Sequence, residues 1–204
     1  MSKGTVSKNK TSRKLKEVKI FVISGPGGVG KTTLVKHLFK NKDVRDAFIR
    51  GISVTTRRKR PYEKEAEDYF FVTSEEFSRL KKQDFFLESQ KVLNQEYGTP
   101  NLFYLLARKK NKGLILCIDV KGGMYLKKKV KAGRIVTVFV GAPTKEELYR
   151  RMKDRAETKS IMKEKVKLAK EELKVSSNYD FLIINKDLKM AVKELQKIVS
   201  VNSN

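Results

Sequence analysis

The chain has few residues of several types: of its 204 residues, one is cysteine and one is histidine. The single cysteine, Cys117, excludes an internal disulfide and is typical of a protein from a reducing compartment. No apolar run approaches the roughly 20 residues of a membrane-spanning helix. No apolar stretch follows the N-terminal lysines, so we expect no secretory signal. His37, the only histidine, is expected to be a solvated or packing residue. These absences predict a cytoplasmic protein without a membrane partner.

Acidic residues are also scarce, with 23 Asp and Glu against 47 Lys and Arg and a net charge of +24. Residues 1–17 are polar and basic and predict a disordered tail. The rest of the excess is spread over segments such as 162–173, where lysines would line a solvated helix face. Such charge can bind nucleic acid, but no interleaved aromatic patch or nucleic-acid motif accompanies it. We therefore favour a lysine-rich composition plus a site for anionic nucleotides, and expect no nucleic-acid partner.

A glycine-rich loop, GPGGVGKTT, occupies residues 25–33 and fits the pattern G-x-x-x-x-G-K-[ST]. An apolar run that predicts a strand precedes it at 19–24, and a helical pattern follows it at 31–39. A strand, this loop and a helix in this order predict a nucleoside triphosphate site. The loop residues expected to bind ATP are Gly25, Pro26, Gly27, Gly28, Val29, Gly30, Lys31, Thr32 and Thr33.

Each part of this loop has a physical task. The glycines let successive backbone N–H groups point inward, and the helix N-terminus adds partial positive charge. Lys31 is expected to reach the β- and γ-phosphates, and the Thr32 hydroxyl is expected to bind Mg²⁺. The sequence therefore predicts Mg·ATP as the bound form.

Short apolar strands alternate with helical patterns along most of the chain, which predicts an α/β fold with a doubly wound parallel sheet of the P-loop NTPase type. Strands are expected at 19–24, 51–56, 69–72, 113–119, 134–140 and 181–185. Helices are expected at 31–39, 75–82, 101–110, 124–130, 146–155, 161–175 and 191–199. Thr73 with Glu76 and Thr144 with Glu147 predict capping boxes. Residues 51–100 interrupt the rhythm and predict a small inserted acceptor segment within a core of 18–50 and 101–204.

A GTPase is an alternative, because P-loops serve several enzyme classes. Asp119 to Gly122 fits D-x-x-G, and the sequence NKDL beginning at Asn185 is similar to the guanine-reading motif N-K-x-D. However, Leu188 stands where that motif needs its aspartate. This favours a kinase over a GTPase.

The inserted segment carries four consecutive basic residues at 57–60, followed by Tyr69. Arg57 and Arg60 are three residues apart, so both can form bidentate charge-assisted bonds to one phosphate. A tyrosine hydroxyl can donate a further bond. Taken alone, these arginines favour a merely solvated basic loop.

Together with its surroundings, this segment resembles the guanylate kinase family. TTRRKRPYEKEAEDYFFV is similar to the GMP-binding signature, with its threonine pair, R-x-x-R, glutamate and D-Y-x-F-V. FLESQKVLNQEYGTP, ILCIDVKGG, APTKEELYRRMKDR and YDFLIINKDLKMAVKEL resemble further family motifs in the same order, from about residue 18 to 199. The resemblance implies Mg·ATP-dependent phosphorylation of GMP or dGMP in purine nucleotide metabolism, with a lid at about 151–165. It leaves a homodimer open.

The resemblance also implies residue roles. Lys31, Arg57, Arg151 and Arg155 would be catalytic, and Asn185 would contact the adenine of ATP. Glu88 would accept hydrogen bonds from the guanine N1–H and 2-amino group, which distinguishes guanine from adenine. The residues implied in GMP binding are Ser53, Arg57, Arg60, Tyr69, Glu88, Tyr97, Thr99 and Asp119.

Several positions depart from the family pattern. Cys117 replaces an aspartate expected near the Mg²⁺ water shell, and Ala156 replaces a lid glycine. Lys165 replaces an arginine and loses its bidentate fork. Lys59 and Tyr62 replace a proline and a glycine. A binding module that holds nucleotide with little or no turnover is therefore kept as the alternative function.

Overall fold

The computed structural model describes residues 17–153 and 159–203, so most of the expected basic tail lies outside the described residues. The strands are β1 (Ile20–Ser24), β2 (Phe48–Arg50), β3 (Val54–Thr55), β4 (Phe70–Phe71), β5 (Phe86–Val92), β6 (Gln95–Pro100), β7 (Gly113–Cys117), β8 (Ile135–Gly141) and β9 (Phe181–Ile184). The helices are α1 (Lys31–Leu38), α2 (Lys42–Ala47), α3 (Ser74–Lys82), α4 (Asn101–Lys110), α5 (Val120–Lys129), α6 (Lys145–Lys153), α7 (Lys159–Lys174) and α8 (Leu188–Val201), with a short 3₁₀ turn at Ser176–Asn178.

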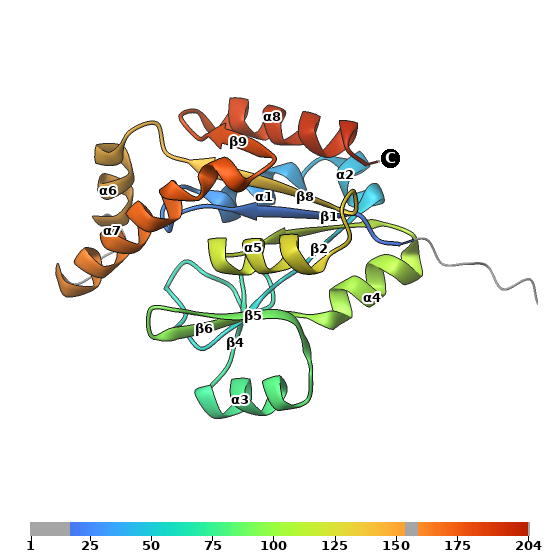
Figure 1. Ribbon diagram of the computed structural model, residues 1–204, viewed down its shortest axis with the longest axis horizontal. Coiled ribbons are helices and arrows are strands. Elements are labelled where there is room, and N and C mark those ends of the chain that lie inside the picture. The colour runs from blue at the N-terminus through green and yellow to red at the C-terminus, as the bar shows by residue number, and fades with distance from the viewer. Residues whose placement is uncertain (1–16, 154–158, 204) are drawn as a thin grey trace, which may run out of the picture.

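Five parallel strands form the central sheet, in the order β2-β7-β1-β8-β9. Figure 1 shows α1 and α8 on one face of this sheet, and α4 and α5 on the other. This confirms the expected α/β fold with a parallel sheet between two helical layers. The ligand-binding edge of such a sheet is the one where the strands end.

Alternation of side chains in β1 explains why both faces are covered. Phe21 and Ile23 pack into the core on the α1 and α8 side, whereas Ile20 and Val22 pack into the core on the α4 and α5 side. All four side chains are at most 1% exposed. Because successive side chains of a strand point to opposite faces, a strand that is apolar at every position needs helices on both sides.

A second sheet, in the order β4-β3-β6-β5, lies below the first in Figure 1 and carries α3 on its outer side. Phe77 of α3 stacks on Phe86 of β5 with ring centroids 4.7 Å apart. At the start of α3, the Thr73 hydroxyl accepts from the Glu76 amide and the Glu76 carboxylate accepts from the Thr73 amide, which confirms this capping box.

Some local predictions differ from the structure. Helix α2 was not expected, because it has six residues and one buried side chain, Val44; Asn41 caps its first turn. The expected strand at 51–56 is wrong in extent: β2 ends at Arg50 and β3 spans two residues. Only half of the second capping box forms. The Thr144 hydroxyl accepts from the Glu147 amide, but the Glu147 carboxylate instead binds Arg150 and Arg151.

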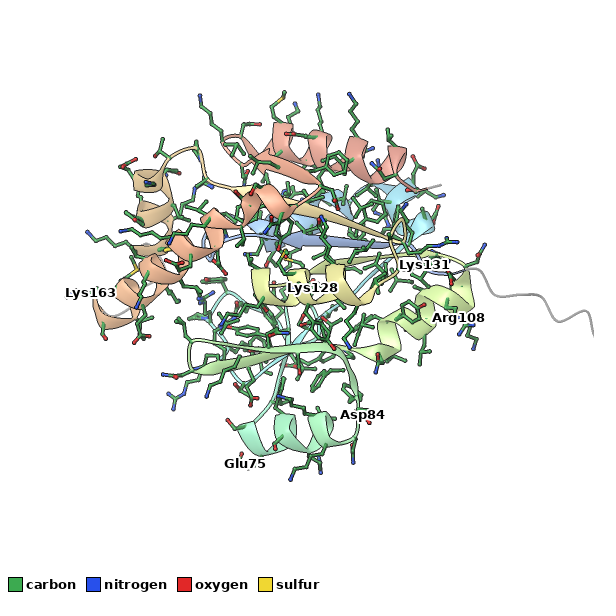
Figure 2. The ribbon with its side chains drawn as sticks, viewed as in Figure 1. Glu75, Asp84, Arg108, Lys128, Lys131 and Lys163 are labelled. Atoms are coloured by element: carbon green, nitrogen blue, oxygen red, sulfur yellow. The ribbon has the colours of Figure 1, made fainter. Side chains whose placement is uncertain are left out.

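The basic residues are distributed over the helical surface. Figure 2 labels Arg108, Lys128, Lys131 and Lys163 on or beside α4, α5 and α7, and all four are exposed. Within the described ranges, no helix is both long and apolar enough to cross a bilayer.

Candidate active site

A cavity of about 890 Å³ opens at the edge where the parallel strands end. Its walls come from the loop after β1, the segment between β3 and β4, the β5–β6 hairpin, the end of β7 and one face of α7. Of the residues expected to bind ATP in 25–33, all except Pro26 and Val29 line this cavity. Of the residues expected to bind GMP in 53–119, all except Thr99 line it. The fold therefore brings the two predicted sets of residues to one cavity.

The backbone of the glycine-rich loop needs glycine at two points of close approach. Gly25 has φ +141°, and a Cβ there would lie 2.1 Å from the Val140 carbonyl oxygen. Gly30 has φ +92°, and a Cβ there would lie 2.6 Å from Asn185 Nδ2. A side chain at either position would be strained and would collide with a neighbour. The loop is thus held tightly against β8 and the end of β9.

Two side chains hold this loop in shape. Lys31 Nζ donates to the carbonyl oxygens of Gly25 (2.5 Å) and Pro26 (3.0 Å). The Asn185 amide, which is buried, donates a 2.7 Å bond to the Val29 carbonyl. A nucleotide phosphate could replace the carbonyls as acceptors for Lys31. Asn185, which was expected to contact the adenine of ATP, contacts the glycine-rich loop itself.

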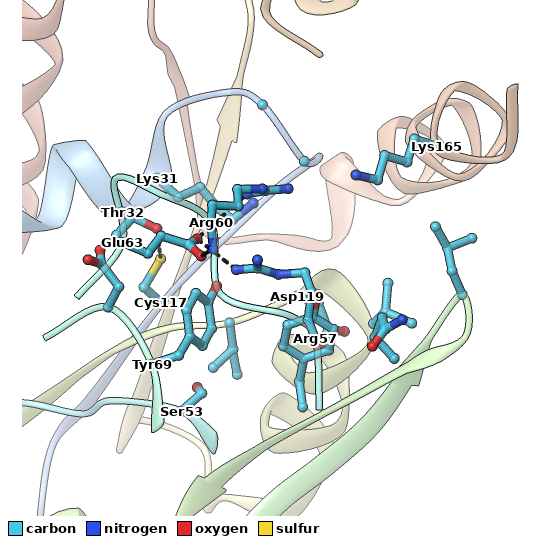
Figure 3. Close-up of a pocket in the computed structure, with 18 of the residues that line it drawn as sticks. Lys31, Thr32, Ser53, Arg57, Arg60, Glu63, Tyr69, Cys117, Asp119 and Lys165 are labelled. Carbon is cyan, nitrogen blue, oxygen red and sulfur yellow. Dashed lines mark hydrogen bonds and ion pairs between the residues drawn. The ribbon is translucent and has the colours of Figure 1, made fainter. Parts of the chain in front are cut away.

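Arg57 and Arg60 converge on one buried carboxylate, that of Glu63. Glu63 Oε1 accepts from Arg57 at 2.7 Å and lies 3.6 Å from the Arg60 guanidinium, while Oε2 accepts from the Arg60 backbone N–H at 2.9 Å. Figure 3 shows Glu63 close to both arginine side chains. Burial alone would raise the pKa of Glu63, but its bonds to Arg57 and Arg60 keep that pKa below the ordinary value. The ionised carboxylate therefore orients both guanidinium groups.

Aromatic rings line the wall beside these arginines. The Arg57 guanidinium lies 5.4 Å from the centre of the Tyr69 ring, and the Tyr69 and Tyr97 rings are 6.0 Å apart. Burial raises the pKa of Tyr69 above its ordinary value. Tyr69 is thus a neutral hydroxyl at physiological pH and can donate a hydrogen bond to a phosphate oxygen.

At the inner end of the cavity, Glu88, Thr99 and Ser53 form a chain of polar contacts. The Thr99 hydroxyl donates a 2.7 Å bond to Glu88 Oε1 and lies 3.5 Å from the Ser53 hydroxyl. Glu88 is 3% exposed, and its Oε2 has no hydrogen-bond partner among the described residues. Burial raises the pKa of Glu88 to about 7, against the opposing bond from Thr99, and nearby Asp119 raises it further. One buried carboxylate oxygen is therefore available for donors on a ligand.

Around Thr32 the side chains are less polar than the motif predicts. Thr32 Oγ1 lies 4.0 Å from Cys117 Sγ, and Figure 3 shows the two side chains next to each other. Burial raises the pKa of the Cys117 thiol, so it is neutral near pH 7. Asp119 caps α5 through a 2.9 Å bond from the Gly122 amide, and burial raises its pKa. Near Thr32, the groups described are thus the Thr32 hydroxyl, the Cys117 thiol and the Asp119 carboxylate.

Of the two arginines expected in the lid, the structure describes one. Arg151 Nε donates to Glu147 at 2.8 Å, and its guanidinium donates to the Asn185 carbonyl at 3.1 Å. This places Arg151 beside the residue that contacts the phosphate loop. Arg155 and Ala156 lie outside the described residues. Lys165, on α7, faces the cavity (Figure 3).

Sequence reasoning assigned no role to Glu172, which lines the same cavity from α7 and is 8% exposed. Burial raises the pKa of Glu172 to about 7, with Lys31 opposing the rise. Sequence reasoning also missed the ion pair of 2.7 Å between Lys36 and Asp68. A weak signal existed for Glu172, since an acidic residue on the apolar side of an amphipathic helix is unusual.

The comparisons with known proteins agree with the geometry. The guanylate kinase family model matches residues 17–202. A guanylate kinase from Malacoplasma penetrans is 41% identical over 189 residues, which cover 91% of this chain and 94% of the relative. A guanylate kinase from Caldanaerobacter subterraneus is 38% identical, with 88% of this chain and 85% of the relative covered.

A solved structure gives the same result. The crystal structure of guanylate kinase from Anaplasma phagocytophilum superposes with a TM-score of 0.73 at 30% identity, covering 93% of this chain and 88% of that one. The match of the family model over nearly the whole described chain, together with these relatives, confirms the resemblance: the chain belongs to the guanylate kinase family.

Proposed function

We propose that this chain transfers the γ-phosphoryl group of Mg·ATP to GMP or dGMP, giving ADP and GDP or dGDP, in purine nucleotide metabolism. Family membership supports ATP-dependent phosphorylation of GMP. The observation that carries the proposal for this chain is the contrast between the two ends of the cavity. One end has Arg57 and Arg60 for a phosphate, and the other has the buried, unpartnered Glu88 oxygen for a base.

Guanine fits the inner end for a simple reason. Its N1–H and 2-amino group are adjacent donors, and a carboxylate can accept from both. Thr99 already donates to one oxygen of Glu88, and the other, which has no partner among the described residues, would accept from the base. Adenine presents an acceptor at N1, which the carboxylate would repel. Glu88, with Ser53, Thr99 and Asp119 near it, therefore selects GMP.

Positioning and charge neutralisation account for the proposed catalysis. Two polyanions must be brought in line, and their repulsion must be offset by cations. Lys31 and the loop amides would hold the ATP phosphates, whereas Arg57, Arg60, Tyr69 and Tyr97 would hold the phosphate of GMP. Arg151, beside Asn185, would reach the transferring group from the lid side. No residue needs to act as a general base.

The residues present fit a magnesium ion carried by the nucleotide. Thr32 supplies a hydroxyl at the cavity wall, and the ion would neutralise charge on the β- and γ-phosphates. Within the described ranges, no group of three or more His, Cys, Asp or Glu side chains could hold a metal alone. This agrees with magnesium sites in which phosphates supply much of the coordination.

The test is an assay of ADP release from Mg·ATP with GMP, AMP, CMP and UMP as acceptors. We expect turnover with GMP, and a decrease in kcat/KM for GMP of roughly 10- to 150-fold in Glu88→Gln, the free-energy range of a hydrogen bond to a charged group. Glu75→Gln, an exposed change on α3, is the matched control. Saturable GMP binding without turnover would instead support the binding module, the alternative that the neutral Cys117 beside Thr32 favours.

A further inference from the structure

Six carboxylates line the cavity, and they differ in whether another residue binds them. These are Glu63, Asp68, Glu88, Asp119, Glu164 and Glu172. The first four have partners: Glu63 binds the two arginines, Asp68 binds Lys36, Glu88 binds Thr99, and Asp119 caps α5. The fifth, Glu164, is exposed. Glu172 alone is buried and accepts no hydrogen bond or ion pair from the part of the chain that the structure describes.

The position of Glu172 on α7 explains its burial. The α7 residues that line the cavity are Ile161, Glu164, Lys165, Leu168 and Glu172. Their spacing of three and four residues places them on one face of the helix. Glu172 is the last of them and lies near the C-terminal end of α7, where Ala169 and Tyr179 are also buried. The helix thus carries a carboxylate into the inner part of the cavity wall.

Charge around Glu172 indicates what it faces. Burial has the largest effect on the pKa of Glu172; Lys31 of the glycine-rich loop and Lys121 in the first turn of α5 lower this pKa, and Asp119, the N-cap of α5, raises it. None is within ion-pair distance of its carboxylate in the described structure. Glu172 is 8% exposed, and a carboxylate desolvated to this extent without a donor from the described residues favours a ligand that supplies a cation or donors.

A magnesium ion bound at the Thr32 hydroxyl would need further oxygen atoms to hold its water molecules. Mg²⁺ is a hard cation that prefers oxygen ligands and keeps several water molecules, which need acceptors. The side chain beside the Thr32 hydroxyl is the thiol of Cys117, which is neutral and a weak acceptor. One oxygen of Asp119 is already engaged by the Gly122 amide. The remaining carboxylate near Lys31 is that of Glu172.

We propose that Glu172 is a positioning residue for the magnesium ion of Mg·ATP, with its carboxylate accepting hydrogen bonds from water molecules bound to that ion. In this role Glu172 compensates for the neutral thiol at Cys117. The inference rests on the proposed function, because it requires that ATP binds at the glycine-rich loop with its metal. It adds a residue on α7 that lies far in the sequence from the loop and from Asp119.

Calorimetric binding of a non-hydrolysable ATP analogue, with EDTA and with Mg²⁺, tests this role at pH 8. The ratio of the two affinities is the metal coupling. We expect Glu172→Gln to bind the analogue in EDTA as well as wild type or better, since it removes a negative charge near the phosphates. The metal coupling should decrease roughly 10- to 100-fold, as for other residues that orient metal-bound groups. Glu172→Asp should restore part of it.

Glu164→Gln is the matched control, because it removes the same charge from the exposed end of the same helix face. It should leave the metal coupling unchanged. Electron paramagnetic resonance of Mn²⁺ bound with the analogue gives an independent reading of metal affinity. Thermal unfolding without ligand should show Glu172→Gln to be at least as stable as wild type, because the variant removes a negative charge from a largely buried side chain.

Three outcomes would overturn the inference. Unchanged metal coupling in Glu172→Gln would exclude a role toward the metal. Weaker binding in EDTA with unchanged coupling would show that Glu172 instead acts on Lys31. A wild type that binds the analogue without metal coupling would overturn the use of magnesium in the proposed function and the role of Glu172 with it. The first two leave the proposed function intact, so the failures can be distinguished.

Discussion

Lys36 on α1 and Asp68, just before β4, form an ion pair of 2.7 Å that joins the phosphate-loop helix to the arginine-bearing segment. The Asp68 side chain is 7% exposed, and its second oxygen accepts from the Lys64 amide at 2.9 Å. Nearby, the Arg50 guanidinium donates to the Glu67 carbonyl at 2.9 Å. The helix after the glycine-rich loop is thus tied to the segment that carries Arg57 and Arg60.

Breaking this pair should weaken the fold, because Lys36→Met leaves Asp68 buried without its cation. We expect a loss of about 1–3 kcal/mol in the free energy of unfolding, measured with denaturant. Lys42→Met is the control: Lys42 pairs with Asp46 at 2.8 Å, but both side chains are mostly exposed. Exposed pairs contribute little to stability, because solvent screens them. Equal losses in the two variants would refute the importance of the Lys36–Asp68 pair.

GMP affinity should depend on pH through Glu88. Burial raises the pKa of this carboxyl to about 7, so below pH 7 it is protonated in the free protein, whereas guanine needs the ionised form. We expect affinity to be constant above about pH 8 and to decrease by roughly tenfold per pH unit below 7, as one proton must be released. Calorimetry from pH 5.5 to 8.5 measures this.

The control for that pH dependence is Glu88→Gln, whose weak GMP binding should keep only the pH dependence of the GMP phosphate, which ionises a second time at a pKa of about 6. The raised pKa also predicts an effect on stability. The folded protein binds the Glu88 proton more tightly than the unfolded chain does. The contribution of this carboxyl to the free energy of unfolding therefore decreases as the pH rises from about 4.5 to 7. At pH 8, unliganded Glu88→Gln should therefore be at least as stable as wild type.

Glu63 should control the GMP phosphate site without contacting the base. Glu63→Gln keeps the shape of the side chain but removes the charge that holds Arg57 and the Arg60 backbone in place. We expect KM for GMP to rise roughly tenfold or more, while KM for ATP changes little, because misplaced positioning groups weaken the site they orient. Initial rates with each substrate varied in turn give both constants. An equal rise in both KM values would indicate a general loss of structure.

Two glycines of the glycine-rich loop, Gly25 and Gly27, offer a matched pair of substitutions. Gly25→Ala places a methyl group against the Val140 carbonyl, whereas Gly27→Ala meets nothing within 4 Å. We expect Gly25→Ala to destabilise the unliganded protein by about 2 kcal/mol or more through strain and overpacking. Gly27→Ala should leave its thermal unfolding nearly unchanged. Similar unfolding temperatures for both variants would contradict the close approach of the loop to β8.

Local patterns in the sequence were sufficient for much of this protein. The apolar run of β1, the glycine-rich loop and the Thr73–Glu76 capping box are each defined by neighbouring residues, so their structures follow from local geometry and propensity. The order of strands and helices predicted the parallel sheet, since short apolar strands need helices on both faces. The boundaries of the insertion, the lid, the homodimer and the cytoplasmic location stay predictions.

Only the tertiary structure decided which distant side chains meet. The bond from Asn185 to Val29 joins residues 156 positions apart, and the approach of Glu172 to Lys31 depends on how α7 packs across the end of the sheet. The Lys36–Asp68 pair likewise arises from packing between α1 and the segment before β4. The periodicity of apolar residues does not predict such contacts. It shows on which face of a helix or strand a side chain lies, whereas the path of the whole chain determines which residue that side chain meets.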